Sequence, residues 1–278
     1  MISVLNSVSS LGAENALSST NTSLQNTLLQ LSTGLKINSG SDDAAGLSIA
    51  AGLGSSISAL TQSSQNASNG VGFLQTADGA LSQVTTLLNR AVTLATEASN
   101  GGLTAAQSTA ADTEFQSITS EITQIGATTN FNGTAVFSAT PLTTFTSDGT
   151  TAGTTTTSTT TGALSATTLA LNALSLTGAT PAAGVTAATA ALTAITAAIN
   201  TISASRGTIG ASVNQLTADS NVENTQITNL TSAQNNVQNA DIGKTVAKMT
   251  QYNVLEQTGM AALSQSNQAQ QAVEKLLQ

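Results

Sequence analysis

Apolar residues in the second half of the chain recur at alternating steps of three and four. From Leu192 to Val237, ten of the fourteen positions stepped in this way are Leu, Ile or Val. A heptad that lasts for more than six repeats predicts a long helix that packs on another helix along one apolar seam. The four polar steps are Arg206, Ser220, Glu223 and Gln234. These polar side chains either fix the register of the partner helix or face solvent.

A matching pattern in the first half predicts the partner helix. The same stepping from Leu53 to Ala95 gives mostly apolar residues. Ser41-Asp42-Asp43 stands before it, where an N-cap and a first-turn carboxylate would complement the helix dipole. Asn100-Gly101-Gly102 stands after it and predicts a helix stop. We expect a shorter third helix beyond this stop, with one apolar face made of Phe115, Ile118, Ile122 and Ile125.

Shorter amphipathic segments occupy the two ends of the chain. At the N-terminal end, Val4, Val8 and Leu11 lead into a run of spaced leucines, and at the C-terminal end Ile242 begins a second run. We define the end stripe as the main apolar residues of both runs. Its members are Leu17, Leu24, Leu28, Leu31, Leu35, Val246, Met249, Leu263, Val273, Leu276 and Leu277. The similarity of the two patterns predicts that the terminal helices pair with one another.

The middle of the chain has a different character, because residues 138–161 consist mainly of Ser and Thr. Thr is β-branched and favours strands, so a Thr-rich hairpin is one interpretation. A polar surface loop with little fixed structure is the other, and the sequence does not separate the two. The exposed hydroxyls could accept O-linked sugars, but we expect an unmodified tract.

Composition removes most chemical functions. Only 7% of the 278 residues are charged, with 14 acidic and 6 basic side chains, no His and no Cys. The chain therefore has no disulfide, no imidazole or thiolate metal ligand and no triad of the usual kind. A net charge of −8 with scattered bases does not fit nucleic-acid binding. We expect no enzyme activity and no cofactor.

Local motifs also favour structural interpretations. The adjacent acids Asp42 and Asp43 predict a helix cap rather than a two-carboxylate site, because no partner acid or base lies nearby. Gly52-Leu53-Gly54 lacks the third glycine of a dinucleotide fingerprint. The first residues lack a basic segment before a continuous apolar core, so we predict no cleavable secretory signal. The segment Ala182 to Ile199 is too rich in Ala and Thr to favour a membrane span.

Several segments, in the same order and at similar spacing, resemble bacterial flagellin. Leu31 to Ala50 reads LSTGLKINSGSDDAAGLSIA and closely resembles the N-terminal signature of that family. Further similar segments are Gln75 to Leu81, Asn130 to Gly133, Asn229 to Ala233 and the tail with Met249, Gln257 and residues 263–268. The resemblance covers roughly residues 1–137 and 185–278. Only about 45 residues remain where the family often carries large variable domains.

The resemblance implies a mainly α fold, an elongated coiled-coil-like helical bundle with paired N- and C-terminal helices and a small β-hairpin region. It implies that residues 1–40 and 241–278 form an inner coiled-coil domain. Residues 41–240 would form an outer helical rod domain, with the Thr-rich β-hairpin at about 134–180. The implied function is that of a structural subunit that polymerises into the flagellar filament for swimming motility.

Two alternatives remain beside flagellin. The hook–filament junction protein has similar ends, but it typically carries a proline after the paired acids, where this chain has Ala44. A secreted coiled-coil adhesin would fit the same periodicity and composition. Uniform long filaments formed by the purified protein would separate flagellin from an adhesin.

The resemblance also implies partners and a location. The partners would be further copies of the same chain, an export chaperone on the C-terminal segment, a filament cap and the hook–filament junction proteins. The chain would leave the cell unfolded through the flagellar type III apparatus and reside in the extracellular filament. No nucleic acid or membrane is expected as a partner. Some flagellins are recognised by Toll-like receptor 5. The resemblance matches the residues central to that recognition to Arg90, Leu94 and Glu114 of this chain.

We further expect both chain ends to fold only on assembly. Ordering the backbone of a terminal helix costs about 1–2 kcal/mol per residue. The few apolar residues of the end stripe return less than this, at about 1.5–3 kcal/mol for each buried side chain. Neighbouring subunits would supply the missing contacts and would couple folding to polymerisation.

Overall fold

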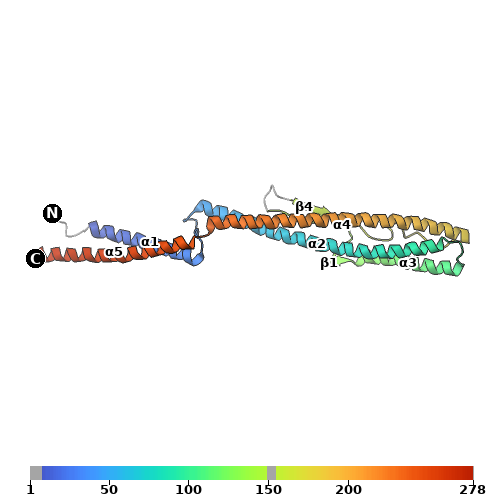
Figure 1. Cartoon of the computed structure of the whole chain (residues 1–278), viewed down its shortest axis with the longest axis horizontal. Coiled ribbons are helices and arrows are strands. Elements are labelled where there is room, and N and C mark those ends of the chain that lie inside the picture. The colour runs from blue at the N-terminus through green and yellow to red at the C-terminus, as the bar shows by residue number, and fades with distance from the viewer. Residues whose placement is uncertain (1–7, 149–154, 278) are drawn as a thin grey trace. The chain divides into compact units, whose positions relative to one another are not determined.

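The structure, a computed structural model, describes residues 8–148 and 155–277 (Figure 1). The helices in these ranges are α1 (Val8–Thr33), α2 (Ala44–Ala98), α3 (Ala105–Thr128), α4 (Pro181–Gln238) and α5 (Ile242–Leu277). The strands are β1 (Asn130–Phe131), β2 (Thr134–Ala135), β3 (Leu142–Thr146) and β4 (Thr155–Thr159). The fold is mainly α, with long helices packed together, as the heptad patterns predict.

The chain divides into two compact units. The terminal unit contains residues 1–55 and 229–278, and the central unit contains residues 56–228. The predicted limits of the inner domain, 1–40 and 241–278, concern the assembled state and stay a prediction.

Helices α2 and α4 run antiparallel and pack along the predicted seam. All fourteen heptad positions from Leu192 to Val237 are buried or half-buried. On α2 the buried face is wider than predicted. The predicted positions such as Leu74 and Leu81 are buried. A second row of mostly small residues, spaced by seven, is buried beside them: Ser63, Gly70, Ala77, Val84, Ala91 and Ala98. Small side chains allow close approach, and α2 packs on more than one neighbour.

The polar steps of the α4 heptad form hydrogen bonds with α2. In the central unit, Arg206 forms two hydrogen bonds with Asp78, at 2.7 and 3.1 Å, and the Oγ atoms of Ser220 and Ser64 lie 2.9 Å apart. Ser63 donates its hydroxyl to Oε1 of Glu223. The fourth step lies in the terminal unit, where Nε2 of Gln234 donates to the carbonyl of Ala50 at 3.2 Å. The sequence left the role of these side chains open, and the structure indicates that they fix the register.

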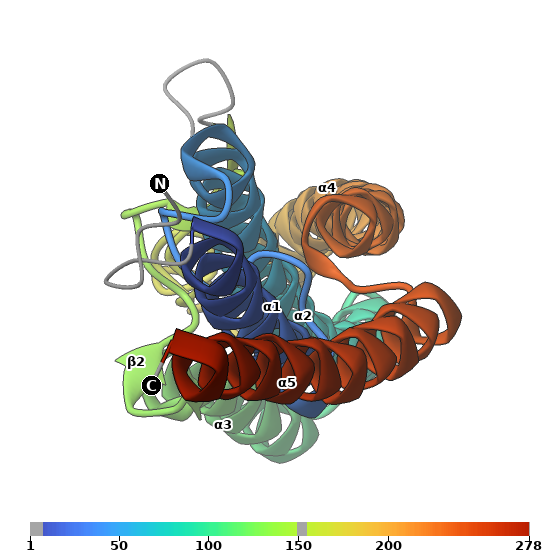
Figure 2. The same cartoon turned by 90° about the vertical axis from the view of Figure 1, so that its left-hand side faces the viewer.

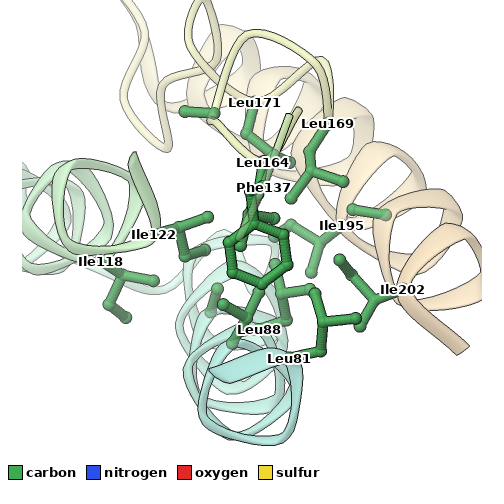
Figure 3. Close-up of a cluster of buried hydrophobic side chains, with 14 of the residues drawn as sticks. Leu81, Leu88, Ile118, Ile122, Phe137, Leu164, Leu169, Leu171, Ile195 and Ile202 are labelled. Carbon is green, nitrogen blue, oxygen red and sulfur yellow. The ribbon is translucent and has the colours of Figure 1, made fainter. Parts of the chain in front are cut away.

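Helix α3 and the segment that follows the β strands complete the core of the central unit. Phe115 and Ile122 are fully buried and Ile118 nearly so, which confirms the predicted apolar face of α3. Figure 3 shows Phe137 between residues of α2, α3 and α4, with leucines of the segment 160–180 closing the cluster. The labelled members are Leu81, Leu88, Ile118, Ile122, Phe137, Leu164, Leu169, Leu171, Ile195 and Ile202.

The Thr-rich region forms strands over only part of its length. β1 pairs antiparallel with β2, and β3 pairs antiparallel with β4 in the register Thr144↔Thr157. A hairpin is therefore the correct interpretation for β3 and β4, while residues 160–180 contain turns and irregular segments but no helix or strand. The buried face of this hairpin carries Thr144, Thr146, Thr157 and Thr159. A Cβ at Gly70 would lie 2.8 Å from Oγ1 of Thr144, so glycine lets β3 lie close to α2.

Helices α2 and α4 are also long and apolar enough to cross a membrane by length and composition, with windows of mean hydropathy 1.4 and 1.7. Both helices are rich in Ala, which counts as apolar, and their Leu, Ile and Val side chains between Val71 and Leu94 and between Leu192 and Leu216 belong to the core shared with α3.

Candidate functional site

The two terminal helices form an antiparallel pair within the terminal unit. Leu35, just after α1, forms an isolated antiparallel bridge with Asn239, just before α5. At the other end of the pair, the Oγ atoms of Ser10 and Ser266 lie 2.8 Å apart. The two helices lie side by side in both views (Figures 1 and 2). The structure therefore confirms the predicted pairing of the N- and C-terminal helices.

The seam between α1 and α5 is regular but poor in large apolar residues. Its α1 positions, at steps of three and four, are Ser10, Ala13, Leu17, Thr20, Leu24, Thr27 and Leu31. Its α5 positions are Thr245, Met249, Tyr252, Glu256, Gly259, Leu263 and Ser266. Thr27 and Thr245 are the members that reach full burial. Small and polar side chains thus alternate with Leu and Met, and the pair buries little apolar surface.

The predicted end stripe divides between this seam and the exposed surface. Leu17, Leu24, Leu31, Met249 and Leu263 are half-buried in the seam. Leu28 and Val246 are exposed, and Leu35 lies beyond the end of α1 because Gly34, at φ +72°, ends the helix. Val273, Leu276 and Leu277 belong to the last turns of α5, but their side chains lie outside the described residues, as does Val4.

Large apolar side chains lie exposed on both terminal helices. Each of these side chains is 40–53% exposed. They are Leu11, Leu28 and Leu29 of α1 and Ile242, Val246, Val254, Leu255 and Met260 of α5. They occupy more than one side of the helix pair. A helix that carries apolar residues on several faces is typically covered on several faces. We call these eight residues the exposed apolar set.

Sequence reasoning missed several members of the exposed apolar set. Leu29, Val254, Leu255 and Met260 lie off the heptad, so a search for one stripe passed over them. The sequence does contain a signal for a second apolar face, because Leu28-Leu29 and Val254-Leu255 are pairs of adjacent apolar residues. Such a pair cannot point to a single face of a helix.

A tightly bonded segment connects α1 to α2. The Lys36 N–H donates to the carbonyl of Gln238 at 2.7 Å, which ties this segment to the end of α4. Asp43 accepts from the Gly46 N–H at 2.9 Å and caps the N-terminus of α2, which confirms the predicted cap. The predicted first-turn carboxylate is wrong, because α2 begins at Ala44 and its first turn contains no acid. The backbone N–H groups of Asn38 and Ser39 donate to Asp42 and lower the pKa of its carboxyl group. Both acids are therefore structural.

The three positions matched to receptor recognition lie in the central unit. Arg90 of α2 and Glu114 of α3 form a two-fold ion pair, with N–O distances of 2.6 and 2.9 Å. The hydrogen bonds between them raise the pKa of Arg90 and lower that of Glu114. Leu94 is only 3% exposed and belongs to the core. The structure thus brings Arg90 and Glu114 together on the surface and places Leu94 beneath it.

The described residues offer little for metal or cofactor chemistry. Among residues 8–148 and 155–277, no group of three His, Cys, Asp or Glu side chains could hold a metal ion. The features with functional character are instead surfaces, above all the exposed apolar set.

Comparisons with known proteins identify the family. Residues 4–141 match the family model of the bacterial flagellin N-terminal helical region, and residues 192–277 match that of the C-terminal helical region. The flagellin of Halalkalibacterium halodurans is 34% identical over 255 residues, which is 91% of each chain. The flagellin of Listeria monocytogenes is 32% identical over 89% of this chain and 90% of its own.

A solved structure is also similar. The crystal structure of Bacillus cereus flagellin has 27% sequence identity and a TM-score of 0.48, and the match covers 57% of this chain and 88% of that chain. Family models at both ends and relatives that match over nearly the whole length agree. The chain belongs to the bacterial flagellin family and is a structural, self-polymerising subunit of the extracellular flagellar filament, not an enzyme.

Proposed function

We propose that subunits assemble through the terminal helix pair, with the exposed apolar set and the end stripe packed against neighbouring copies. The single observation that carries this proposal is the contrast on α1 and α5. The seam inside the pair alternates Thr, Gly and Ser with half-buried Leu and Met, while further Leu and Val side chains about half exposed lie outside it. Covering these side chains with another subunit contributes about 25 cal/mol for each Å² of apolar surface removed from water.

Folding of the ends is then coupled to polymerisation. In a single chain the α1–α5 pair buries too little apolar surface to offset the loss of backbone entropy. Contacts with neighbouring copies stabilise the folded ends by mass action. Residues 1–40 and 241–278 act as the inner coiled coil of the filament in this proposal, and residues 41–240 act as its outer domain.

Limited proteolysis tests this proposal. Brief digestion should trim the monomer to a core of roughly residues 40–240 and leave the filament nearly intact. Deletion of residues 273–278 removes three members of the end stripe and should leave a soluble, helical chain that no longer polymerises. A trimmed chain that builds normal filaments, or monomer ends as resistant as the core, would contradict the proposal.

Export and the remaining partners follow from the family. The chain is proposed to travel unfolded through the flagellar type III apparatus, with an export chaperone on the C-terminal segment and contacts to the filament cap and junction proteins. A chain without Cys suits this route, because no disulfide hinders threading. Retention of the chaperone by residues 241–278, and its loss when these residues are deleted, is the measurement that tests this part.

Recognition by Toll-like receptor 5 is a second proposed role. Arg90 and Glu114 supply an exposed pair of charges on neighbouring helices, while Leu94 contributes by packing in the core below them. Monomer should activate a receptor reporter cell, and Arg90→Ala should reduce that activation while leaving the helix content unchanged. An inert wild-type monomer would count against this role.

A further inference from the structure

One pocket of the terminal unit gathers half of the basic side chains of the chain. Lys36, Lys244 and Lys248 line a cavity of about 330 Å³ where α1 ends and α5 begins, and the whole chain has six bases. Backbone hydrogen bonds hold Lys36 in place, since its N–H donates to Gln238 and its carbonyl accepts from Gln30. We call this cavity the basic pocket.

The three lysines of the basic pocket are exposed and present positive charge on the surface of the terminal unit. Lys244 stands in the first turn of α5, where the helix dipole disfavours positive charge, and Lys248 stands one turn further on. They are also four residues apart, so the two like charges lie on one face and repel. The one acid on the wall, Asp241, accepts the Lys244 N–H at 3.1 Å as a cap. In the described part of the chain none of these lysines forms an ion pair.

The central unit has a pocket of opposite charge. Asp148, Asp219 and Glu223 line a cavity of about 240 Å³ whose wall contains no basic residue in the described ranges. Glu223 is 6% exposed, and its Oε2 atom is buried without a hydrogen-bond partner among the described residues. Burial raises the pKa of Glu223, and the neighbouring charge of Asp219 adds to this effect. An incoming cation would stabilise this acidic pocket.

We propose that the basic pocket of one subunit docks on the acidic pocket of a second copy. The two pockets are different patches of one chain, so their contact is heterologous, and repeated heterologous contacts build an open filament rather than a closed dimer. The acidic pocket holds a buried carboxylate oxygen without a hydrogen-bond partner, and the basic pocket offers exposed lysines without an ion-pair partner among the described residues. The inference rests on self-polymerisation of this family and adds a charge contact to the apolar packing proposed above.

Charge reversal tests the contact on the full-length chain. The basic-pocket variant is Lys244→Glu/Lys248→Glu, and the acidic-pocket variant is Asp148→Lys/Asp219→Lys. Each should raise the critical concentration for polymerisation, measured by sedimentation, about tenfold, equivalent to about 1.4 kcal/mol. The quadruple variant that joins both changes should polymerise nearly as well as wild type, because the two reversed pockets are again complementary.

A matched quadruple variant controls for net charge. It combines Lys244→Glu/Lys248→Glu with Glu97→Lys/Glu121→Lys, two exposed acids outside the acidic pocket, and its net charge equals that of wild type. This variant should stay as defective as the basic-pocket variant. Helix content by circular dichroism excludes misfolding as the cause.

The outcomes separate cleanly. If wild type forms filaments and the basic-pocket variant does so equally well, the basic pocket is not an interface. If both quadruple variants behave alike, the partner surface is not the acidic pocket. If wild type itself forms no filament, the failure lies with self-polymerisation and not with this contact.

Discussion

The terminal and central units follow the same heptad spacing but differ in what the seam contains. In the central unit Leu81, Leu88 and Ile195 fill the seam and belong to a continuous core. In the terminal unit Thr27 and Thr245 are its most buried positions, and large apolar side chains lie outside it. Periodicity therefore determines which helices pair, while the size of the seam residues determines how far that pairing stabilises a single chain.

The largest expected effect compares a core residue with an exposed one. Phe115→Ala should destabilise the monomer by about 3–5 kcal/mol, because it empties the core of the central unit. Leu29→Ala should change monomer stability by less than about 0.5 kcal/mol, because Leu29 is 50% exposed, yet it should weaken polymerisation. Urea unfolding and sedimentation measure the two effects. Equal losses of monomer stability would remove the distinction between the units.

A pair of glycine substitutions sharpens the description of the central unit. A Cβ at Gly126 would overlap the carbonyl oxygen of Leu164, so Gly126→Ala should displace the leucines of segment 160–180 and cost about 1–3 kcal/mol. Gly207 of α4 has open space around it, so Gly207→Ala should instead stabilise by about 0.5–1 kcal/mol. Thermal unfolding followed by circular dichroism measures both. A tolerated Gly126→Ala would mean that α3 does not pack on this segment.

Glu223 makes the central unit sensitive to pH. Burial raises the pKa of the Glu223 carboxyl group in the folded state, so the folded protein binds this proton more tightly than the unfolded chain does. The resulting contribution to the free energy of unfolding is complete below the ordinary pKa of 4.5 and is lost as pH rises through the folded pKa. Glu223→Gln should therefore be more stable than wild type at pH 7–8, with the difference vanishing in acid. Unfolding of both proteins across pH 4–8 checks this. A variant less stable at pH 8 would contradict the assignment.

The smallest effect is expected at the ion pair of the α2–α4 seam. Arg206→Gln should cost only about 0.5 kcal/mol, because both side chains are partly exposed and water screens the pair. Arg206 lowers the pKa of Asp78, so this contribution is present above the ordinary value of 3.8 and is lost as pH falls through the folded pKa. Unfolding in low and high salt should show the difference between variant and wild type shrinking with salt.

Much of the helical fold could be predicted from the sequence. The α4 heptad, the face of α3 around Phe115 and the Asp43 cap depend on local spacing and local hydrogen bonds, which the sequence displays directly. Strand formation at 142–146 and 155–159 could not be separated from a loop. The strands carry buried threonines that meet the long helices, Thr144 beside Gly70 of α2 and Thr157 on Asp219 of α4, and these contacts are distant in sequence.

The candidate site was predictable only in part. The terminal pairing followed from two similar stripes, but the division of the end stripe did not. Leu28 lies about one turn from both Leu24 and Leu31, and it differs from them only in its angle to α5. The basic and acidic pockets were not anticipated either. Lys36 and Lys244 are far apart in sequence and meet through the bridge between Leu35 and Asn239.

Hydrogen exchange of monomer and filament in the same buffer tests the central claim most directly. The amides of α1 and α5 should exchange rapidly in the monomer and slowly in the filament, because neighbouring subunits cover the exposed apolar set. The amides of α2 and α4 in the central unit should be protected in both states. Amides of α1 and α5 that are protected in the monomer as strongly as those of the central unit would contradict the account.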